Sequence, residues 1–210
     1  MVPNPLIESS RGERLGIDWV WSALPTSIVE SDLELLSQPE RARAATFKAA
    51  RRRLEYVAAR AQLRRTLGAA LGVAPSAVEI ALDEFGKPQA PSGGLQFNLA
   101  HSAGGLLIGW GRRAIGVDLE SAQRQPRRID RVRIVAEVRD GLSVDLIVAF
   151  TLVEAATKAL GRGVGALRGL RLDAVVGVDE VRLASPAGAL INAARVPVPE
   201  AYAGAVAVPV

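Results

Sequence analysis

Two pairs of charged residues in the second half of the chain have the types and spacing to do chemistry. The stretch AIGVDLE carries Asp118 and Glu120, which share one face of a strand about 6–7 Å apart at Cα. The stretch FTLVEAATKALG carries Glu154 and Lys158, which are neighbours four positions apart on a helix. Carboxylate oxygens are the ligands that Mg²⁺ prefers, and Mg²⁺ is commonly shared with the phosphates of a substrate. The alternative is a solvated strand end beside an ordinary helical ion pair.

The chain has a single histidine, His101, in the stretch LQFNLAHSAGG. A lone histidine is more often structural than catalytic, but Gly104 and Gly105 follow it and allow a ligand to approach the backbone closely.

Four motifs occur in the order and approximate spacing of the 4′-phosphopantetheinyl transferases: FGKP, FNLAHS, IGVDLE and EAATKALG. The chain most closely resembles the Sfp type, the larger single-chain form. The resemblance runs from about SQPERARAATF to EAATKALG, over half the chain. It implies an α+β fold of two similar halves related by a pseudo-two-fold axis. These halves would be residues 1–113 and residues 114–210, the second carrying the acidic metal site.

The resemblance also implies a reaction. The 4′-phosphopantetheine arm of coenzyme A would move to a serine of an acidic acyl or peptidyl carrier protein, and adenosine 3′,5′-bisphosphate would be released. The step would depend on Mg²⁺ held by Asp118, Glu120 and Glu154. The resemblance thus implies that the histidine strand and the acidic strand lie side by side around one anionic ligand, which the histidine holds by a hydrogen bond and the acids hold through the metal. Glu154 would also take the proton of the acceptor serine, and Lys158 would assist by contacting phosphate.

The residues that the resemblance assigns to coenzyme A lie in the first half. His101 would contact a phosphate, Lys87 would sit at the nucleotide or phosphate pocket, and Pro88 would shape that loop. Arg43 matches the family's basic residue for the 3′-phosphate. Ala100 stands before the histidine where the family often has serine, so one hydroxyl contact to phosphate is lost.

Some departures from the family pattern leave a second interpretation open. Phe150 and Val153 replace a tryptophan and a lysine of the helix motif, and the segment 121–149 is short and lacks the usual aromatic residues. The chain could therefore be a catalytically impaired homologue that binds coenzyme A or a carrier. The short segment is basic, and arginine suits recognition of an acidic carrier. The arginines proposed for that contact are Arg124, Arg127, Arg128 and Arg131.

Composition predicts a globular, cytoplasmic protein. Hydrophobic residues make up 49% of the 210 residues, and the absence of cysteine excludes disulfides, zinc-thiolate sites and cysteine nucleophiles. No apolar run is long enough to cross a bilayer, and the start of the chain has no secretion signal. A nucleic-acid binder is disfavoured because aromatic residues are only 4% of the chain and no recognition motif is visible. We expect a monomer, because two halves in one chain complete the site without a partner subunit.

Hydrophobic patterns predict the elements that must position these residues. Alternation predicts strands at LGIDWVWSAL, VEIAL, LQFNLA, GLLIGW and AIGVDL, and closing strands at GLRLDAVVGV, VRLAS and YAGAVAVPV. A helix is expected over residues 48–71, ended by Gly72 and Pro75, and another over residues 143–160, ended by Gly161.

Two further elements depend on weaker signals. Ser31 or Asp32 is expected to cap an early helix, which Pro39 would restart after Gln38. The polar, arginine-rich segment 121–142 is expected to be irregular.

Overall fold

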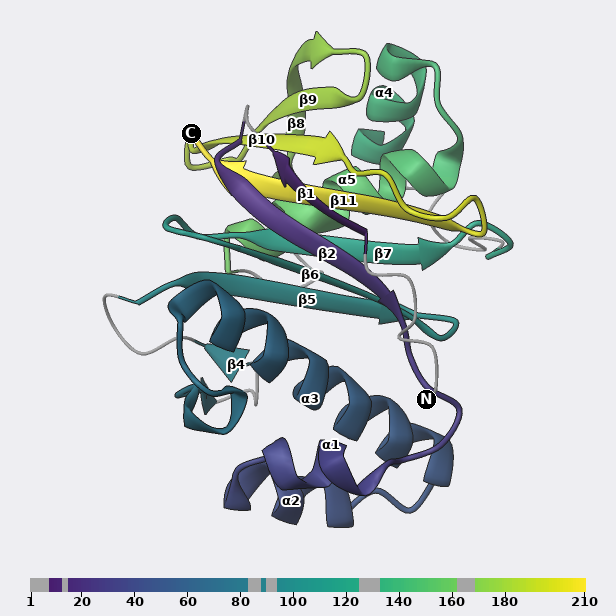
Figure 1. The fold of residues 1–210 in the computed structure, drawn as a ribbon. Coiled ribbons are helices and arrows are strands. Elements are labelled where there is room, and N and C mark those ends of the chain that lie inside the picture. The colour runs from purple at the N-terminus through teal and green to yellow at the C-terminus, as the bar shows by residue number, and fades with distance from the viewer. Residues whose placement is uncertain (1–7, 13–14, 83–87, 90–93, 125–132, 162–168) are drawn as a thin grey trace.

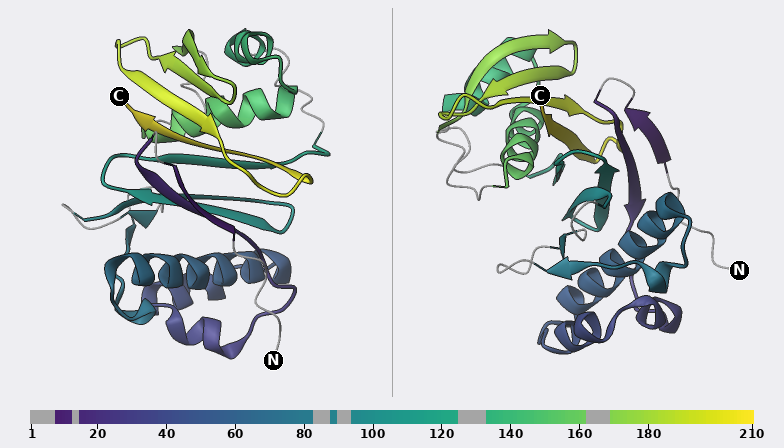
Figure 2. Two further views of the ribbon diagram at one scale, coloured as in Figure 1. Left: turned by 45° about the horizontal axis from the view of Figure 1, so that its top comes forward. Right: turned by 90° about the vertical axis from the view of Figure 1, so that its left-hand side faces the viewer.

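The computed structural model describes residues 8–12, 15–82, 88–89, 94–124, 133–161 and 169–210. They form stacked layers, in which a group of helices, a four-stranded sheet, a five-stranded sheet and a second group of helices follow one another (Figure 1). The two helical groups lie at opposite ends of the molecule (Figure 2). The architecture is mixed α and β with two sheets, which is compatible with the expected α+β class. The pseudo-two-fold relation between the halves stays a prediction.

The first sheet has the order β1-β2-β6-β5, with every neighbouring pair antiparallel. The strand predicted at LGIDWVWSAL is confirmed, and its alternation is visible in the packing. Ile17, Trp19 and Trp21 enter the hydrophobic cluster shared with the second sheet, whereas Val20 enters the cluster shared with the long helix α3 (Ala50–Leu71). The strands are β1 (Glu8–Gly12), β2 (Ile17–Ala23), β5 (Gln96–Ser102) and β6 (Gly105–Gly111).

The second sheet has the order β7-β11-β10-β9-β8 and is also antiparallel throughout. The three strands predicted at LQFNLA, GLLIGW and AIGVDL are confirmed, but they divide between the sheets because β7 pairs with β11. The predicted VEIAL strand is reduced to β3 (Ala81–Leu82), which pairs with β4 (Pro88–Gln89). The strands of the second sheet are β7 (Gly116–Ser121), β8 (Arg171–Gly177), β9 (Glu180–Ala184), β10 (Leu190–Arg195) and β11 (Tyr202–Pro209).

The first group of helices covers one face of the first sheet. The helix predicted over 48–71 is confirmed as α3, and Gly72 ends it in the left-handed conformation with φ 69°. The predicted cap was wrong, because Ser31 and Asp32 lie inside α1 and the cap of the next helix is Ser37. The Ser37 hydroxyl accepts from the amide of Glu40, and the Glu40 carboxylate accepts from the amide of Ser37. These helices are α1 (Glu30–Leu35), α2 (Gln38–Ala45) and α3 (Ala50–Leu71), followed by the 3₁₀ turn Pro75–Ala77.

Several arginines of α3 hold the helical layer together. Arg64 is buried, bonds Glu40 at 2.8 Å, and also donates to the carbonyl of Val78 at 2.9 Å. Arg65 bonds the buried Asp32 of α1 at 2.6 Å. Arg64 and Arg65 are therefore engaged in internal ion pairs, and their charges do not contribute to a free anion-binding surface.

The second group consists of α4 (Arg133–Leu142) and α5 (Leu146–Ala159). The expectation that 121–142 is irregular was wrong for its last ten residues, which form α4. Ile134, Val135 and Val138 lie on one face of that helix and are buried against the α5 core cluster. Within the described part of the chain, no helix has the length and apolar character needed to cross a membrane.

Candidate active site

A glycine on β7 allows helix α5 to lie directly against that strand. Gly116, Asp118 and Glu120 alternate with Val117 and Leu119, which enter the cluster between the two sheets. The first three residues therefore face α5. A Cβ atom at Gly116 would lie only 1.8 Å from the carbonyl oxygen of Ala155, so the close approach needs glycine.

This approach brings Lys158 of α5 onto Asp118 of β7. The lysine ammonium donates to Oδ1 of Asp118 at 2.7 Å and to the carbonyl of Val117 at 2.9 Å. The other carboxylate oxygen of Asp118, Oδ2, is buried without a hydrogen-bond partner. Burial raises the pKa of Asp118 above the usual range for aspartate, and this effect outweighs the lowering by Lys158. Asp118 thus carries an unused oxygen in a site that resists negative charge.

Glu154 adds a third carboxylate to this group. It is buried, with 8% of its surface exposed. Burial raises the pKa of Glu154, and the negative charges of Asp118 and Glu120 raise it further, while Lys158 lowers it. Glu154 and Lys158 lie about one helical turn apart on α5, so both act on the acids of β7.

Glu120 is also buried and lies near the end of β7. Its side chain accepts from the hydroxyl of Ser102 at 3.3 Å and forms an ion pair with Arg124. More than half of the Arg124 side chain is exposed. The other three arginines expected to meet a carrier lie outside the described residues: Arg127, Arg128 and Arg131.

The chemistry of these donors fits a hard cation such as Mg²⁺, because all are carboxylate oxygens and one of them, Oδ2 of Asp118, is buried without a partner. The arrangement is not a preformed ligand set. Asp118 is drawn to Lys158, and Glu120 is drawn to Arg124 and Ser102. Among the residues that the structure describes, no three histidine, cysteine or acidic side chains form a group that could hold a metal. A metal would have to compete with these ion pairs.

The expectation that the histidine strand and the acidic strand lie side by side is confirmed by two hydrogen bonds. The Asn98 side chain accepts from the amide of Val117 at 3.0 Å, and the Ser102 hydroxyl accepts from the amide of Ser121 at 3.2 Å. His101 is exposed and, by alternation, projects from the opposite face of β5 to Ser102. A ligand that touches both His101 and the acids must therefore pass around the end of β5.

A cavity of about 620 Å³ lies at that end of the first sheet. The turn between β5 and β6 contributes Gly104, three residues after His101. Arg51, in the first turns of α3, brings a guanidinium that is paired with Glu55 and remains largely exposed. Sequence reasoning did not single out Arg51 for a site role, because nothing in the helical pattern distinguishes it from its arginine neighbours. The lining residues are Leu24, Pro25, Thr26, Ser27, Ile28, Ala50, Arg51, Leu54, Glu55 and Gly104.

The remaining predicted binding residues that the structure describes are not gathered at the acidic group. Arg43 lies on α2 with its guanidinium 5.2 Å from the ring centre of Phe47. Ala100 is buried in the cluster between the sheets, so its side chain faces core. Pro88 is half-buried in β4, and Lys87 lies outside the described residues.

The two α5 residues that depart from the family's helix motif have their side chains in the hydrophobic core. Phe150 and Val153 are both buried in the cluster that α5 shares with the second sheet, and Val153 is completely inaccessible. An apolar side chain suits that position. These substitutions therefore leave the polar face of α5, with Glu154 and Lys158, unchanged.

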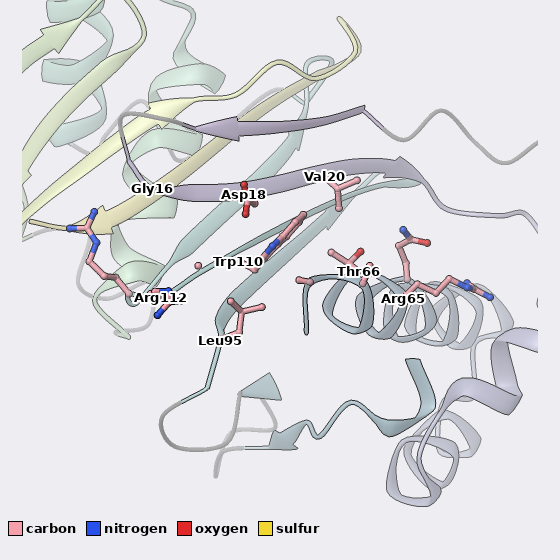
Figure 3. A pocket seen from close by; sticks show the side chains of 13 residues that line it. Gly16, Asp18, Val20, Arg65, Thr66, Leu95, Trp110 and Arg112 are labelled. Atoms are coloured by element: carbon pink, nitrogen blue, oxygen red, sulfur yellow. The ribbon is translucent and has the colours of Figure 1, made fainter. Parts of the chain in front are cut away.

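A larger cavity of about 780 Å³ lies between the first sheet and the second half of α3, on the sheet face that turns away from the second sheet. Asp18, Trp110 and Thr66 face it from β2, β6 and α3 (Figure 3). Its charged groups are largely engaged: Arg65 pairs with Asp32, and the Arg113 guanidinium donates to two backbone carbonyls. This cavity is separate from the candidate active site.

One comparison with known proteins is informative. A stretch of 101 residues is 38% identical to the 4′-phosphopantetheinyl transferase HetI of Nostoc sp. (strain PCC 7120). The match takes in 46% of this chain and 43% of that protein, so it spans less than half of the relative's length. No protein-family model matches the chain. The similarity agrees with the resemblance that the four motifs carry.

Proposed function

We propose that this chain is a 4′-phosphopantetheinyl transferase, which moves the phosphopantetheine arm of coenzyme A to a serine of an acyl or peptidyl carrier protein. The observation that carries the proposal is the meeting of Asp118, Glu154 and Lys158 where α5 lies on β7, beside the strand that bears His101. The similarity to HetI supports the same reaction class.

The residues suit the transfer of one proton and the exchange of one P–O bond for another at phosphorus. The serine oxygen of the carrier forms a bond to the phosphorus that bears the pantetheine arm, and the bond from that phosphorus to adenosine 3′,5′-bisphosphate breaks. Glu154 takes the serine proton. A base works best when its pKa lies near the working pH, and burial beside other carboxylates raises the pKa of Glu154 in that direction.

The negative charge of the bound phosphates would be balanced at the acidic group by the Lys158 ammonium and by Mg²⁺. Lys158 lies against Asp118 and can turn its ammonium toward a bound pyrophosphate. Asp118, Glu120 and Glu154 do not form a metal-holding group in the described structure, so they would hold Mg²⁺ only after Asp118 leaves Lys158 and Glu120 leaves Arg124. The metal would then neutralise charge on the phosphoryl oxygens.

Coenzyme A would lie around the end of β5. Its pyrophosphate would meet the acidic group, and its nucleotide would enter the 620 Å³ cavity beside the β5–β6 turn. Within this arrangement His101 contacts a phosphate from the outer face of β5, and Arg51 is a better candidate than Arg43 for the 3′-phosphate because it lines that cavity. Pro88 lies on β4, at the opposite end of β5 from this cavity (Figure 1), and Lys87 lies outside the described residues, so the predicted role of these two residues has no support from the described structure.

The carrier would approach past Arg124, which is paired with the buried Glu120. Arg124 lies there with more than half of its side chain in solvent, which suits an acidic partner. The reaction requires no second subunit, so we infer a monomer that works in the cytoplasm, where coenzyme A and carrier proteins meet.

A transfer assay tests the proposal. Purified protein is incubated with an apo-carrier, coenzyme A and Mg²⁺, and the carrier is weighed by mass spectrometry. Wild type should add one phosphopantetheine arm, Glu154→Gln should add it at least about 100-fold more slowly, and the exposed-site control Glu200→Gln should match wild type. Coenzyme A binding without any transfer would instead identify an impaired homologue.

A further inference from the structure

The seam between β5 and β7 is bridged by side chains. In the described part of the chain, backbone ladders join β5 to β6 and β7 to β11, and these pairs belong to different sheets. Asn98 and Ser102 of β5 reach across and accept hydrogen bonds from the amides of Val117 and Ser121 of β7. These amides lie on the edge of β7 that no backbone ladder covers.

The two bridging bonds fix one register. Asn98 and Ser102 are four residues apart, and so are the amides of Val117 and Ser121 that they accept from. The strands therefore run in the same direction, in step, along this seam. Asn98 is buried, with 5% of its surface exposed, so its bond is shielded from competing water.

Ser102 does more than bridge the seam. A hydroxyl group has one proton to donate and two lone pairs that accept. The amide of Ser121 occupies a lone pair of Ser102, which leaves the hydroxyl proton for Oε2 of Glu120, 3.3 Å away. An ionised carboxylate can only accept, so the direction of this bond is defined. Ser102 therefore links the register of β7 to the orientation of the Glu120 carboxylate.

We propose that Ser102 is a positioning residue that orients the carboxylate of Glu120, and that Asn98 fixes the register in which β7 presents its acids to α5. The consequence for catalysis rests on the proposed transferase function. The hydrogen bonds themselves can be tested without it.

Amide hydrogen exchange, followed by NMR, tests the bonds directly. Ser102→Ala should speed exchange at the Ser121 amide at least about tenfold, whereas Ser102→Thr keeps a hydroxyl and should preserve its protection. Exchange at Val117 should be unchanged in both. Ser185→Ala is the matched control, because Ser185 is a buried serine that also accepts from a backbone amide, in the turn before β10. Unchanged exchange at Ser121 in Ser102→Ala would overturn the inference.

Metal binding and kinetics test the positioning role. Mn²⁺ titrated into the protein and followed by electron paramagnetic resonance should bind about tenfold more weakly to Ser102→Ala than to wild type, and Ser102→Thr should restore the affinity. In the transfer assay, kcat should fall by a similar factor while the KM for coenzyme A stays near that of wild type. Ser185→Ala should leave both readouts unchanged.

The outcomes separate the two proposals. If wild type transfers nothing, the transferase function fails, while the exchange and Mn²⁺ results still decide the role of Ser102. If Ser102→Ala loses protection at Ser121 but binds Mn²⁺ as tightly as wild type, Ser102 supports only the backbone, and the positioning role is overturned.

Discussion

Replacing Gly116 by alanine adds one methyl group at the contact between β7 and α5. That methyl carbon would lie 1.8 Å from the carbonyl oxygen of Ala155 and 2.4 Å from the amide nitrogen of Ala159. Both are backbone atoms of a helix, which cannot rotate out of the way as a side chain can. Helix α5 would have to retreat by about 1.5 Å to restore an ordinary contact.

The retreat would act on the two residues of α5 that do the proposed chemistry. Lys158 bonds Asp118 at 2.7 Å, so a shift of that size breaks the bond. A misplacement of about 1 Å can lower a rate about 100-fold. Overpacking also lowers the free energy of unfolding by about 1–3 kcal/mol, which for a chain of this size lowers Tm by about 2–12 °C.

Transfer rate and thermal unfolding should be measured together for Gly116→Ala. Gly141→Ala on α4 is the control, because its methyl would meet only side-chain atoms of Leu172 and Val175, at 3.2 and 3.3 Å, and these can move. The control should keep wild-type transfer. If Gly116→Ala also keeps wild-type rate and Tm, α5 does not depend on that glycine for its place on β7, and the described geometry of the site is wrong.

Three further outcomes are expected. Asn98→Ala leaves the amide of Val117 without its partner and should lower the free energy of unfolding in urea by about 1–3 kcal/mol; a change within error would show that the seam does not need this bond. Glu154→Gln should raise Tm by about 2–4 °C above neutral pH in metal-free buffer. Burial and the charge of Asp118 raise the pKa of Glu154 in the folded protein, so wild type loses stability as the pH rises through that pKa. Below about pH 4 the carboxyl is protonated in both the folded and the unfolded state, and the two proteins should have the same Tm. Coenzyme A should raise Tm more with Mg²⁺ than with a chelator, and Asp118→Asn should abolish that difference, which an equal shift in both buffers would contradict.

The local geometry of the site was predictable because it depends on the repeat of each element alone. Asp118 and Glu120 share a strand face because side chains alternate, and Glu154 and Lys158 share a helix face because four residues make about one turn. The structure has both pairs arranged in this way. A glycine two positions before Asp118 was also a readable signal, since glycine inside a strand often marks a close backbone approach.

The long-range geometry was not predictable, because the hydrophobic pattern of a strand does not specify which other strand it pairs with. β7 pairs with β11, which lies more than 80 residues later in the chain, and in the described part of the chain its hydrogen bonds to β5 come from the side chains of Asn98 and Ser102 and not from a backbone ladder. β10 was missed because its inward residues include the small Ala193, which weakens the alternation. Helix α4 was missed because its arginines and acids masked the spacing of Ile134, Val135 and Val138.

The mass of an apo-carrier after incubation with this protein, coenzyme A and Mg²⁺ tests the proposed reaction most directly. We predict a gain of one phosphopantetheine arm on a single serine, no gain when a chelator replaces Mg²⁺, and a greatly slowed gain with Glu154→Gln. An unmodified carrier with wild-type protein, in the presence of Mg²⁺ and across several acyl and peptidyl carriers, would contradict the assignment of transferase activity to the acids of β7 and α5.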